Sequence, residues 1–149
     1  MAILTDDMKR IIAEVRLCYA ATVTPEGKPN LSPKGSIVVL GDSELGFADL
    51  GSPRTLENVR HNPAIEINVV DPFVRKGYRF KGRAEIVSDP AACAVIGKLL
   101  GPAYPFTQVV KIHVDQALPV ASPIYHLSKV TESEIKQVWL ETYGYRSVR

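Results

Sequence analysis

Residues 77–87, with the sequence GYRFKGRAEIV, alternate between two kinds of side chain and constrain the fold more than any other segment. A period of two is typical of a half-buried β-strand, because successive side chains of a strand point to opposite faces. One face is largely apolar and is predicted to point toward a core: Tyr78, Phe80, Gly82, Ala84 and Ile86. The other face carries the charge: Arg79, Lys81, Arg83, Glu85 and, as its one apolar member, Val87. The segment therefore predicts a sheet with one buried face.

Five other segments are apolar, β-prone and separated by turn residues, and each predicts a strand: 17–24, 29–40, 45–50, 64–70 and 107–117. The first three of these, joined by tight turns, are expected to form an antiparallel meander. Pro33 and Gly35 interrupt the segment 29–40, so we expect a bulge or a sheet edge there.

Four stretches have the caps and the apolar spacing of helices, and they lie at 6–15, 53–62, 90–100 and 132–142. Residues 119–128 are predicted to be irregular. Six short strands and four helices without sustained βαβ alternation favour a mainly β fold. We expect a closed or nearly closed antiparallel barrel with peripheral helices.

Composition limits the class of protein. A chain of 149 residues with 46% hydrophobic and 23% charged residues is expected to form one domain over 1–149. No stretch approaches the ~20 apolar residues of a membrane span, and the first ten residues lack a signal-peptide core. Cys18 and Cys93 form no disulfide framework, so a reduced cytoplasmic location is expected. A formal net charge of +2 argues against a globally basic nucleic-acid binder.

Familiar catalytic motifs are absent from the sequence. It contains no dinucleotide-binding glycine motif, no P-loop and no nucleophile elbow. His61, His113 and His126 are not at metal-ligand spacing from another histidine, a cysteine or a carboxylate. The sequence therefore assigns no metal and no catalytic residue. A protein that does chemistry without such groups must use a cofactor.

The start of the helix at 53–62 has the features of a phosphate cradle. A helix N-terminus presents unpaired N–H groups and partial positive charge. Arg54 adds a planar cation, Ser52 and Thr55 add hydroxyls, and Gly51 allows close backbone approach. This pattern predicts a site for a phosphomonoester. The alternative is a capped surface helix with an exposed arginine.

Two further segments are candidate binding surfaces. The irregular backbone at 31–36 would expose N–H and C=O groups that suit the edge of a flat heteroaromatic ring. The alternative is an edge strand that Pro33 protects from pairing. The stripe of Arg79, Lys81 and Arg83 could neutralise a phosphate, form a solvated face, or bind nucleic acid.

Three pieces of sequence then carry a resemblance: GKPNLSPKGSIVVL at 27–40, LGFADLGSPRTLENVRHNPAIEINVVD at 45–71 and KGYRFKGRAEIV at 76–87. In this order and at this spacing, the chain resembles the pyridoxamine 5′-phosphate oxidase-like FMN-binding split β-barrel family over residues 20–87. The resemblance implies a six-stranded antiparallel split β-barrel. It also implies a homodimer with two FMN molecules at the subunit interface.

The resemblance also implies which residues bind the cofactor. The segment along the isoalloxazine ring contains Ser32, Pro33, Lys34 and Gly35. The phosphate contacts map to Leu50, Gly51, Ser52, Arg54, Thr55 and Asn58. On the basic strand, Arg79 and Lys81 are candidates near the flavin. A C-terminal aromatic residue of the partner covers the ring in many members, and Trp139 or Tyr125 is the candidate here. The alternative for Trp139 is core packing of the last helix.

Two differences from true pyridoxamine phosphate oxidases indicate which branch of the family the chain resembles. The chain ends YGYRSVR and lacks the arginine-rich ending of true pyridoxamine phosphate oxidases, and Arg54-Thr55 stands where they carry Arg-Lys. The resemblance is therefore to the short general FMN-binding branch. We expect an FMN-dependent oxidoreductase with a small-molecule substrate and neither a nucleic-acid nor a membrane partner. The alternatives are a non-catalytic flavin-binding or flavin-sensing protein, an F420-dependent reductase, and a small barrel that binds nucleic acid.

Overall fold

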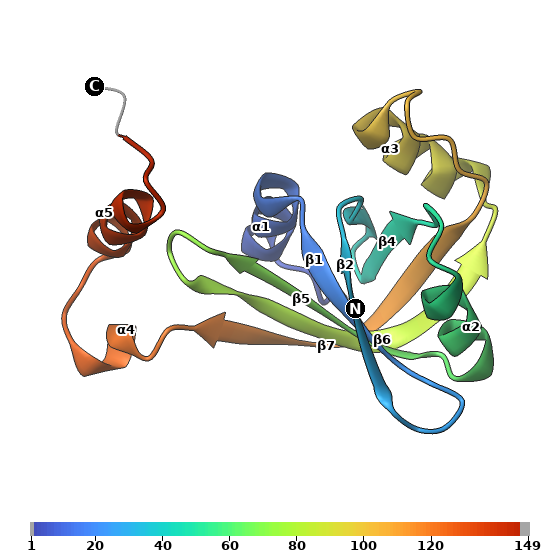
Figure 1. Cartoon of the computed structure of the whole chain (residues 1–149), viewed down its shortest axis with the longest axis horizontal. Coiled ribbons are helices and arrows are strands. Elements are labelled where there is room, and N and C mark those ends of the chain that lie inside the picture. The colour runs from blue at the N-terminus through green and yellow to red at the C-terminus, as the bar shows by residue number, and fades with distance from the viewer. Residues whose placement is uncertain (1, 147–149) are drawn as a thin grey trace.

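Seven antiparallel strands form one sheet in the computed structural model, which describes residues 2–146 (Figure 1). The strands are β1 (Cys18–Val23), β2 (Pro29–Lys34), β3 (Val38–Gly41), β4 (Glu44–Ala48), β5 (Ala64–Asp71), β6 (Lys76–Val87) and β7 (Val109–Ala121). The helices are α1 (Asp6–Val15), α2 (Pro53–His61), α3 (Pro90–Leu100), α4 (Ile124–Leu127) and α5 (Glu132–Thr142). The predicted mainly β antiparallel fold is confirmed. The end of the C-terminal segment YGYRSVR lies outside the described residues.

The strands follow the order β2-β1-β5-β6-β7-β4-β3 across the sheet. The longest pairing joins β6 to β7, and its register shifts between Lys81 and Gly82. A Cβ atom at Gly82 would lie 2.1 Å from the carbonyl oxygen of His113 on β7. Only glycine therefore allows the two strands to approach this closely at the irregularity.

The strand count and the predicted meander are the main corrections. The segment 29–40, predicted as one strand, is broken at 35–37 into β2 and β3, so the sheet has seven strands and not six. β1 pairs with β2 and β3 pairs with β4, and these two hairpins lie at opposite edges of the sheet. The break follows Pro33, which cannot donate a ladder hydrogen bond, and includes the buried Ser36, whose Oγ accepts from the Ala48 N–H at 2.9 Å.

This break explains the curvature of the sheet. Lys34, the last residue of β2, and Val38, the first residue of β3, are four residues apart, a span of at most about 14 Å. The two edge strands must therefore lie near each other although five strands separate them in the sheet order. No pairing within residues 2–146 joins β2 to β3, so the curled sheet stays open between them. The result is a split barrel.

The core lies inside this curled sheet. The inward face predicted for β6 supplies the buried Phe80 and Ala84, and Phe47 of β4 packs in the same cluster. α1 covers it with Met8, Ile11 and Ile12, and begins with a capping box between Thr5 and Met8. α2 adds Leu56 and Val59. α3 covers a second, smaller cluster, which contains Val38, Ala48, Ala92, Ile96 and Val109. The four predicted helices are confirmed.

Residues 119–128 are more regular than predicted. β7 extends to Ala121, opposite Lys76 of β6, and the four-residue helix α4 follows. The C-terminal arm, residues 122–146, then places α5 at the opposite end of the molecule from α2 (Figure 1). None of the helices in residues 2–146 has the length and hydrophobicity that a bilayer crossing demands.

Candidate functional site

The structure brings together two segments that the sequence singled out separately. β2 ends at Lys34, and its side-chain Nζ donates a hydrogen bond to the Oγ of Ser52 at 2.6 Å. Ser52 directly precedes α2. The predicted ring segment and the predicted phosphate segment are therefore neighbours at one end of the barrel.

The start of α2 has free hydrogen-bond donors. Ser52 occupies the N-cap position as predicted, but its side chain makes no capping hydrogen bond, because its Oγ accepts from Lys34. Asp49 Oδ1 instead accepts from the N–H groups of Gly51 and Ser52, both at 3.1 Å. The N–H groups of Arg54 and Thr55 have no acceptor within residues 2–146. These two donors and the positive end of the helix dipole suit an anion.

A line of polar side chains continues from this point into the barrel. The buried polar residues within 2–146 are Thr22, Lys34, Ser36, Thr55 and Asn58. Asn58 Nδ2 on α2 donates to Thr22 Oγ1 on β1 at 3.0 Å, and Asn30 Nδ2 on β2 donates to the same oxygen at 3.5 Å. The sequence analysis missed Thr22, Asn30 and Ser36. The alternation of β1 could have indicated Thr22, because it shares a face with the buried Cys18 and Ala20.

Lys34 has an unusual environment for a lysine. Lys34 is only 6% exposed, and its Nζ lies 5.5 Å from the centre of the Phe47 ring. No carboxylate in residues 2–146 lies within ion-pair distance of it. Burial lowers the pKa of Lys34, and it outweighs the opposite effects of Cys18 and Asp49. Burial also raises the pKa of the Cys18 thiol to about 12. Lys34 is therefore a buried cation with a hydroxyl as its partner.

The other predicted residues of these segments are more exposed. Ser32 is half-buried on the same face of β2 as Lys34, whereas Pro33 points the other way and is exposed. Leu50, Gly51 and Arg54 are exposed at the start of α2. Gly35 is exposed at the break after β2.

Arg79 and Lys81 lie on the outer face of the barrel. Arg79 Nε pairs with Glu66 Oε1, and Lys81 Nζ lies 3.7 Å from Glu66 Oε2. Glu66 belongs to the neighbouring strand β5. Within one chain the two basic residues therefore share the single negative charge of Glu66, and no hydrogen bond or ion pair within residues 2–146 joins either of them to the start of α2. Their role near a flavin stays a prediction.

Trp139 lies on α5, far from the start of α2 in this chain (Figure 1). The guanidinium carbon of Arg75 is 3.6 Å from the centre of its ring, and Arg75 Nη2 donates to Tyr143 Oη at 2.6 Å. Tyr125, the other candidate, donates its hydroxyl to the carbonyl oxygen of Val74 at 2.6 Å. Both aromatic residues thus contact the β5–β6 turn of their own chain. Contact with a flavin would require a partner chain.

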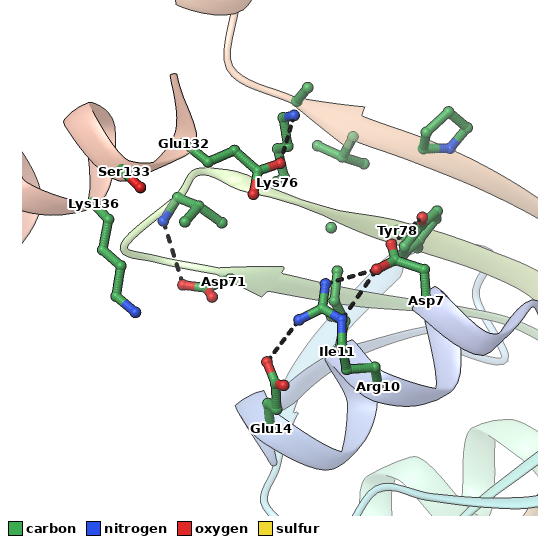
Figure 2. Close-up of a pocket in the computed structure, with 15 residues that line it drawn as sticks. Asp7, Arg10, Ile11, Glu14, Asp71, Lys76, Tyr78, Glu132, Ser133 and Lys136 are labelled. Carbon is green, nitrogen blue, oxygen red and sulfur yellow. Dashed lines mark hydrogen bonds and ion pairs between the residues drawn. The ribbon is translucent and has the colours of Figure 1, made fainter. Parts of the chain in front are cut away.

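A cavity of about 640 Å³ lies elsewhere in the molecule, between α1, the β5–β6 turn and α5 (Figure 2). We call it the ionic hollow. Arg10 pairs there with Asp7 at 2.7 Å and with Glu14 at 2.8 Å, and Lys76 pairs with Glu132 at 2.8 Å. Hydrogen bonds from Tyr78 and Arg10 lower the pKa of Asp7. These charges largely neutralise one another, so the ionic hollow fits a ligand anion poorly. No group of histidine, cysteine and carboxylate side chains in residues 2–146 is arranged to hold a metal.

Comparison with known proteins identifies the family. The family model for pyridoxamine 5′-phosphate oxidase matches residues 4–121. The chain therefore belongs to the pyridoxamine 5′-phosphate oxidase family. No curated protein matches the chain.

Solved structures share the fold. The crystal structure of HupZ of Group A Streptococcus is 31% identical, with a TM-score of 0.72 over 80% of this chain and 96% of that chain. An FMN-binding protein of Syntrophomonas wolfei is 16% identical, with a TM-score of 0.67 over 77% of this chain and 84% of that one. An F420 reductase is 20% identical, with a TM-score of 0.62 over 77% of this chain and 98% of that one. These structures share the fold of this chain.

Proposed function

We propose that this protein is an FMN-binding oxidoreductase that acts as a homodimer on a small-molecule substrate. The observation that carries the proposal is the start of α2, where the N–H groups of Arg54 and Thr55 have no acceptor within residues 2–146 and the buried Lys34 donates to Ser52. Arg54, exposed in the first turn of this helix, adds a second cation. A phosphate requires such donors and positive charge. The family match and the FMN-binding structural relative support a flavin as the carrier of that phosphate.

The residues present fit this cofactor. Gly51, Ser52, Arg54 and Thr55 would hold the phosphate at the helix start. The polar inner face of β2, with Asn30 and Ser32, would lie along the rest of the molecule. Bound FMN supplies hydride or electron transfer, which this chain's own side chains cannot perform. The role of the chain is to bind the flavin, orient it and limit its contact with water.

The outer face of β1 and β2 supports the homodimer. Tyr19 and Leu31 are exposed there, with Leu31 68% exposed. Adjacent exposed apolar side chains on one sheet face favour burial against another protein. The predicted roles of Arg79 and Lys81 also require a second copy of the chain, because their ion pairs within one chain are with Glu66. The roles predicted for Trp139 and Tyr125 depend on this arrangement.

The test is an absorbance spectrum of the purified protein, followed by identification of the released chromophore by mass. We expect flavin absorption, the mass of FMN, and the mass of a dimer in solution. Release of F420 would mean that F420, and not FMN, is the cofactor. A colourless protein that does not bind added FMN would contradict the proposal. Binding of a single-stranded oligonucleotide by that protein would then favour a nucleic-acid-binding barrel. Turnover with reduced nicotinamides and common acceptors separates an oxidoreductase from a flavin-sensing protein, which would bind FMN without turnover.

A further inference from the structure

We propose that an apolar hollow between α1, β3 and α3 binds a small aliphatic carboxylate, with the hydrocarbon chain inside the hollow and the carboxylate on Arg16. The hollow has a volume of about 260 Å³. Its lining includes the aliphatic side chains of Ile12, Ile37, Val38 and Leu99. The lining contains no residue of α2, so the inference goes beyond the proposed function and does not depend on it.

The apolar hollow lies where the two hydrophobic clusters of the barrel meet. Ile12 of α1 and Ile37 belong to the main cluster, whereas Val38 of β3 belongs to the smaller cluster under α3. α1 and α3 both pack on β3, each over its own cluster, and the space between the two helices is not filled. The floor of the hollow is therefore part of the core, and its shape is fixed by the packing of the barrel.

Ala13 explains why α1 does not fill this space. Lys9, Ile12, Ala13 and Arg16 follow one another at helical spacing, so they form one stripe along α1 and its C-cap. Ile12 is fully buried on this stripe, but Ala13 carries only a methyl group and is exposed. A larger apolar residue at position 13 would occupy the hollow.

Arg16 places a positive charge at this site. It is the C-cap of α1 with a φ of 56°, a left-handed conformation that glycine usually takes at the end of a helix. Its Nη2 donates to the carbonyl oxygen of Leu99 at 3.5 Å. No carboxylate within residues 2–146 lies within ion-pair distance of it. Lys9, the other cation of the lining, pairs with Asp42 at 2.9 Å, so Arg16 is the one that can accept an anionic ligand.

A small aliphatic carboxylate matches these features. The apolar residues that line the hollow are all aliphatic, which suits a hydrocarbon chain. A cavity of about 150 Å³ holds benzene, so this larger volume suits a ligand of roughly ten heavy atoms. A guanidinium group can bind a carboxylate through two parallel N–H···O hydrogen bonds. The charge of Arg16 should therefore select an acid over an alcohol with the same chain.

The experiment titrates the full chain with octanoate and with octan-1-ol, and follows the methyl resonances of isoleucine, leucine and valine by NMR. Arg16→Gln removes the charge, Arg16→Lys keeps it, and Ala13→Leu fills the hollow. Arg60→Gln, in the last turn of α2, and Ala94→Leu, at an exposed position of α3, are the matched controls. Thermal melts verify that each variant folds.

We expect octanoate to shift the methyl signals of Ile12, Ile37, Val38 and Leu99. Arg16→Gln should weaken octanoate binding roughly 10- to 100-fold, the effect of losing one charged hydrogen bond, and leave octan-1-ol binding unchanged. Arg16→Lys should retain part of the preference for the acid. Ala13→Leu should abolish binding of both ligands, and the two controls should behave as wild type. Each methylene removed from the acid should weaken binding roughly fourfold.

Arg16→Gly separates ligand binding from a structural role. Glycine takes the left-handed conformation freely, and the hydrogen bond to Leu99 is long and exposed. The melting temperature should therefore rise by about 2–4 °C while octanoate binding falls. If Arg16 only holds the end of α3, the variant will melt earlier and bind octanoate as the wild type does, which would overturn the inference.

Three further results would overturn it. The first is a wild type whose methyl signals at the apolar hollow do not respond to octanoate. The second is equal binding of octanoate and octan-1-ol. The third is unchanged octanoate binding in Ala13→Leu, which would place the ligand elsewhere. None of these results depends on whether the protein binds FMN.

Discussion

Two lysines of this chain show opposite ways of placing a positive charge. Lys76, at the ionic hollow, pairs with Glu132 at 2.8 Å and lies 4.2 Å from the ring centre of Tyr125, and the hydrogen bond to Glu132 raises its pKa. Lys34, at the start of α2, has only a hydroxyl partner, and burial lowers its pKa. A charge that the chain already neutralises contributes to structure. A buried charge that the chain leaves unneutralised indicates a ligand.

Arg54→Ala should produce the largest change in FMN affinity among these variants. A smaller change would contradict the comparison between the start of α2 and the ionic hollow. Removing the guanidinium should weaken FMN binding by about 1–3 kcal/mol, because one charge-assisted hydrogen bond is lost. The melting temperature without flavin should hardly change, since Arg54 is exposed. Arg60→Ala, in the last turn of the same helix, is the control and should bind FMN as wild type does. Unchanged FMN affinity in Arg54→Ala would contradict the assignment of the phosphate site to the start of α2.

Thr22→Val tests the polar line inside the barrel. The substitution keeps the shape of the side chain but leaves the buried Asn58 amide without the oxygen that accepts its hydrogen bond. We expect a loss of about 1–2 kcal/mol in the free energy of unfolding, measured by urea denaturation. Thr24→Val also removes a hydroxyl acceptor, that of the Lys28 N–H, but this hydrogen bond is exposed to solvent, so the loss should be smaller. Equal losses in the free energy of unfolding for the two variants would mean that the buried Thr22–Asn58 hydrogen bond stabilises the fold no more than an exposed one.

Arg75→Ala tests how the C-terminal arm is held. The guanidinium lies on the ring of Trp139, the one tryptophan of the chain, so fluorescence reports this contact directly. Loss of a cation–π contact should release α5 with a change of about 0.5–2 kcal/mol. We expect a shifted emission maximum at denaturant concentrations that leave the barrel folded. If emission stays the same, the arm is held by other contacts, such as the Lys76–Glu132 pair.

Lys76→Met should have the smallest effect and sharpens the contrast with Lys34. Because the Lys76–Glu132 pair is partly exposed, its loss should cost less than about 1 kcal/mol in the free energy of unfolding. The loss should shrink further in high salt. The ratio of FMN to riboflavin affinity should be that of the wild type. A large fall in that ratio would place the phosphate near the ionic hollow and contradict the comparison.

Local periodicity predicted the parts of the fold that depend on neighbouring residues. The alternation of 77–87 predicted the inward position of Phe80 and the outward position of Arg79. Pro33 and Gly35 indicated an irregularity in the segment 29–40, but as a bulge or a sheet edge and not as the break into two strands. The two parts of that segment, β2 and β3, lie at opposite edges of the sheet, and this placement depends on how the whole sheet curls. No local pattern contains that information, so the predicted meander was wrong.

The site divides in the same way. The helix rules pointed to Ser52, Arg54 and Thr55, because capping and unpaired N–H groups are local properties. The contact between Lys34 and Ser52 joins residues that are 18 apart in sequence, and it exists because the barrel brings β2 to α2. The alternation of β1 could have indicated that Thr22 is buried, but threonine is an ordinary residue of a strand, so its type gave no signal of a functional role. Trp139 was singled out through the family resemblance, and its place in a dimer stays a prediction.

A crystal structure of the protein with FMN is the most direct measurement of where the phosphate binds. The account predicts phosphate oxygens within hydrogen-bond distance of Lys34 Nζ and of the N–H groups of Arg54 and Thr55. A phosphate in the ionic hollow, or an FMN that leaves the Lys34 ammonium without an anionic partner, would contradict it.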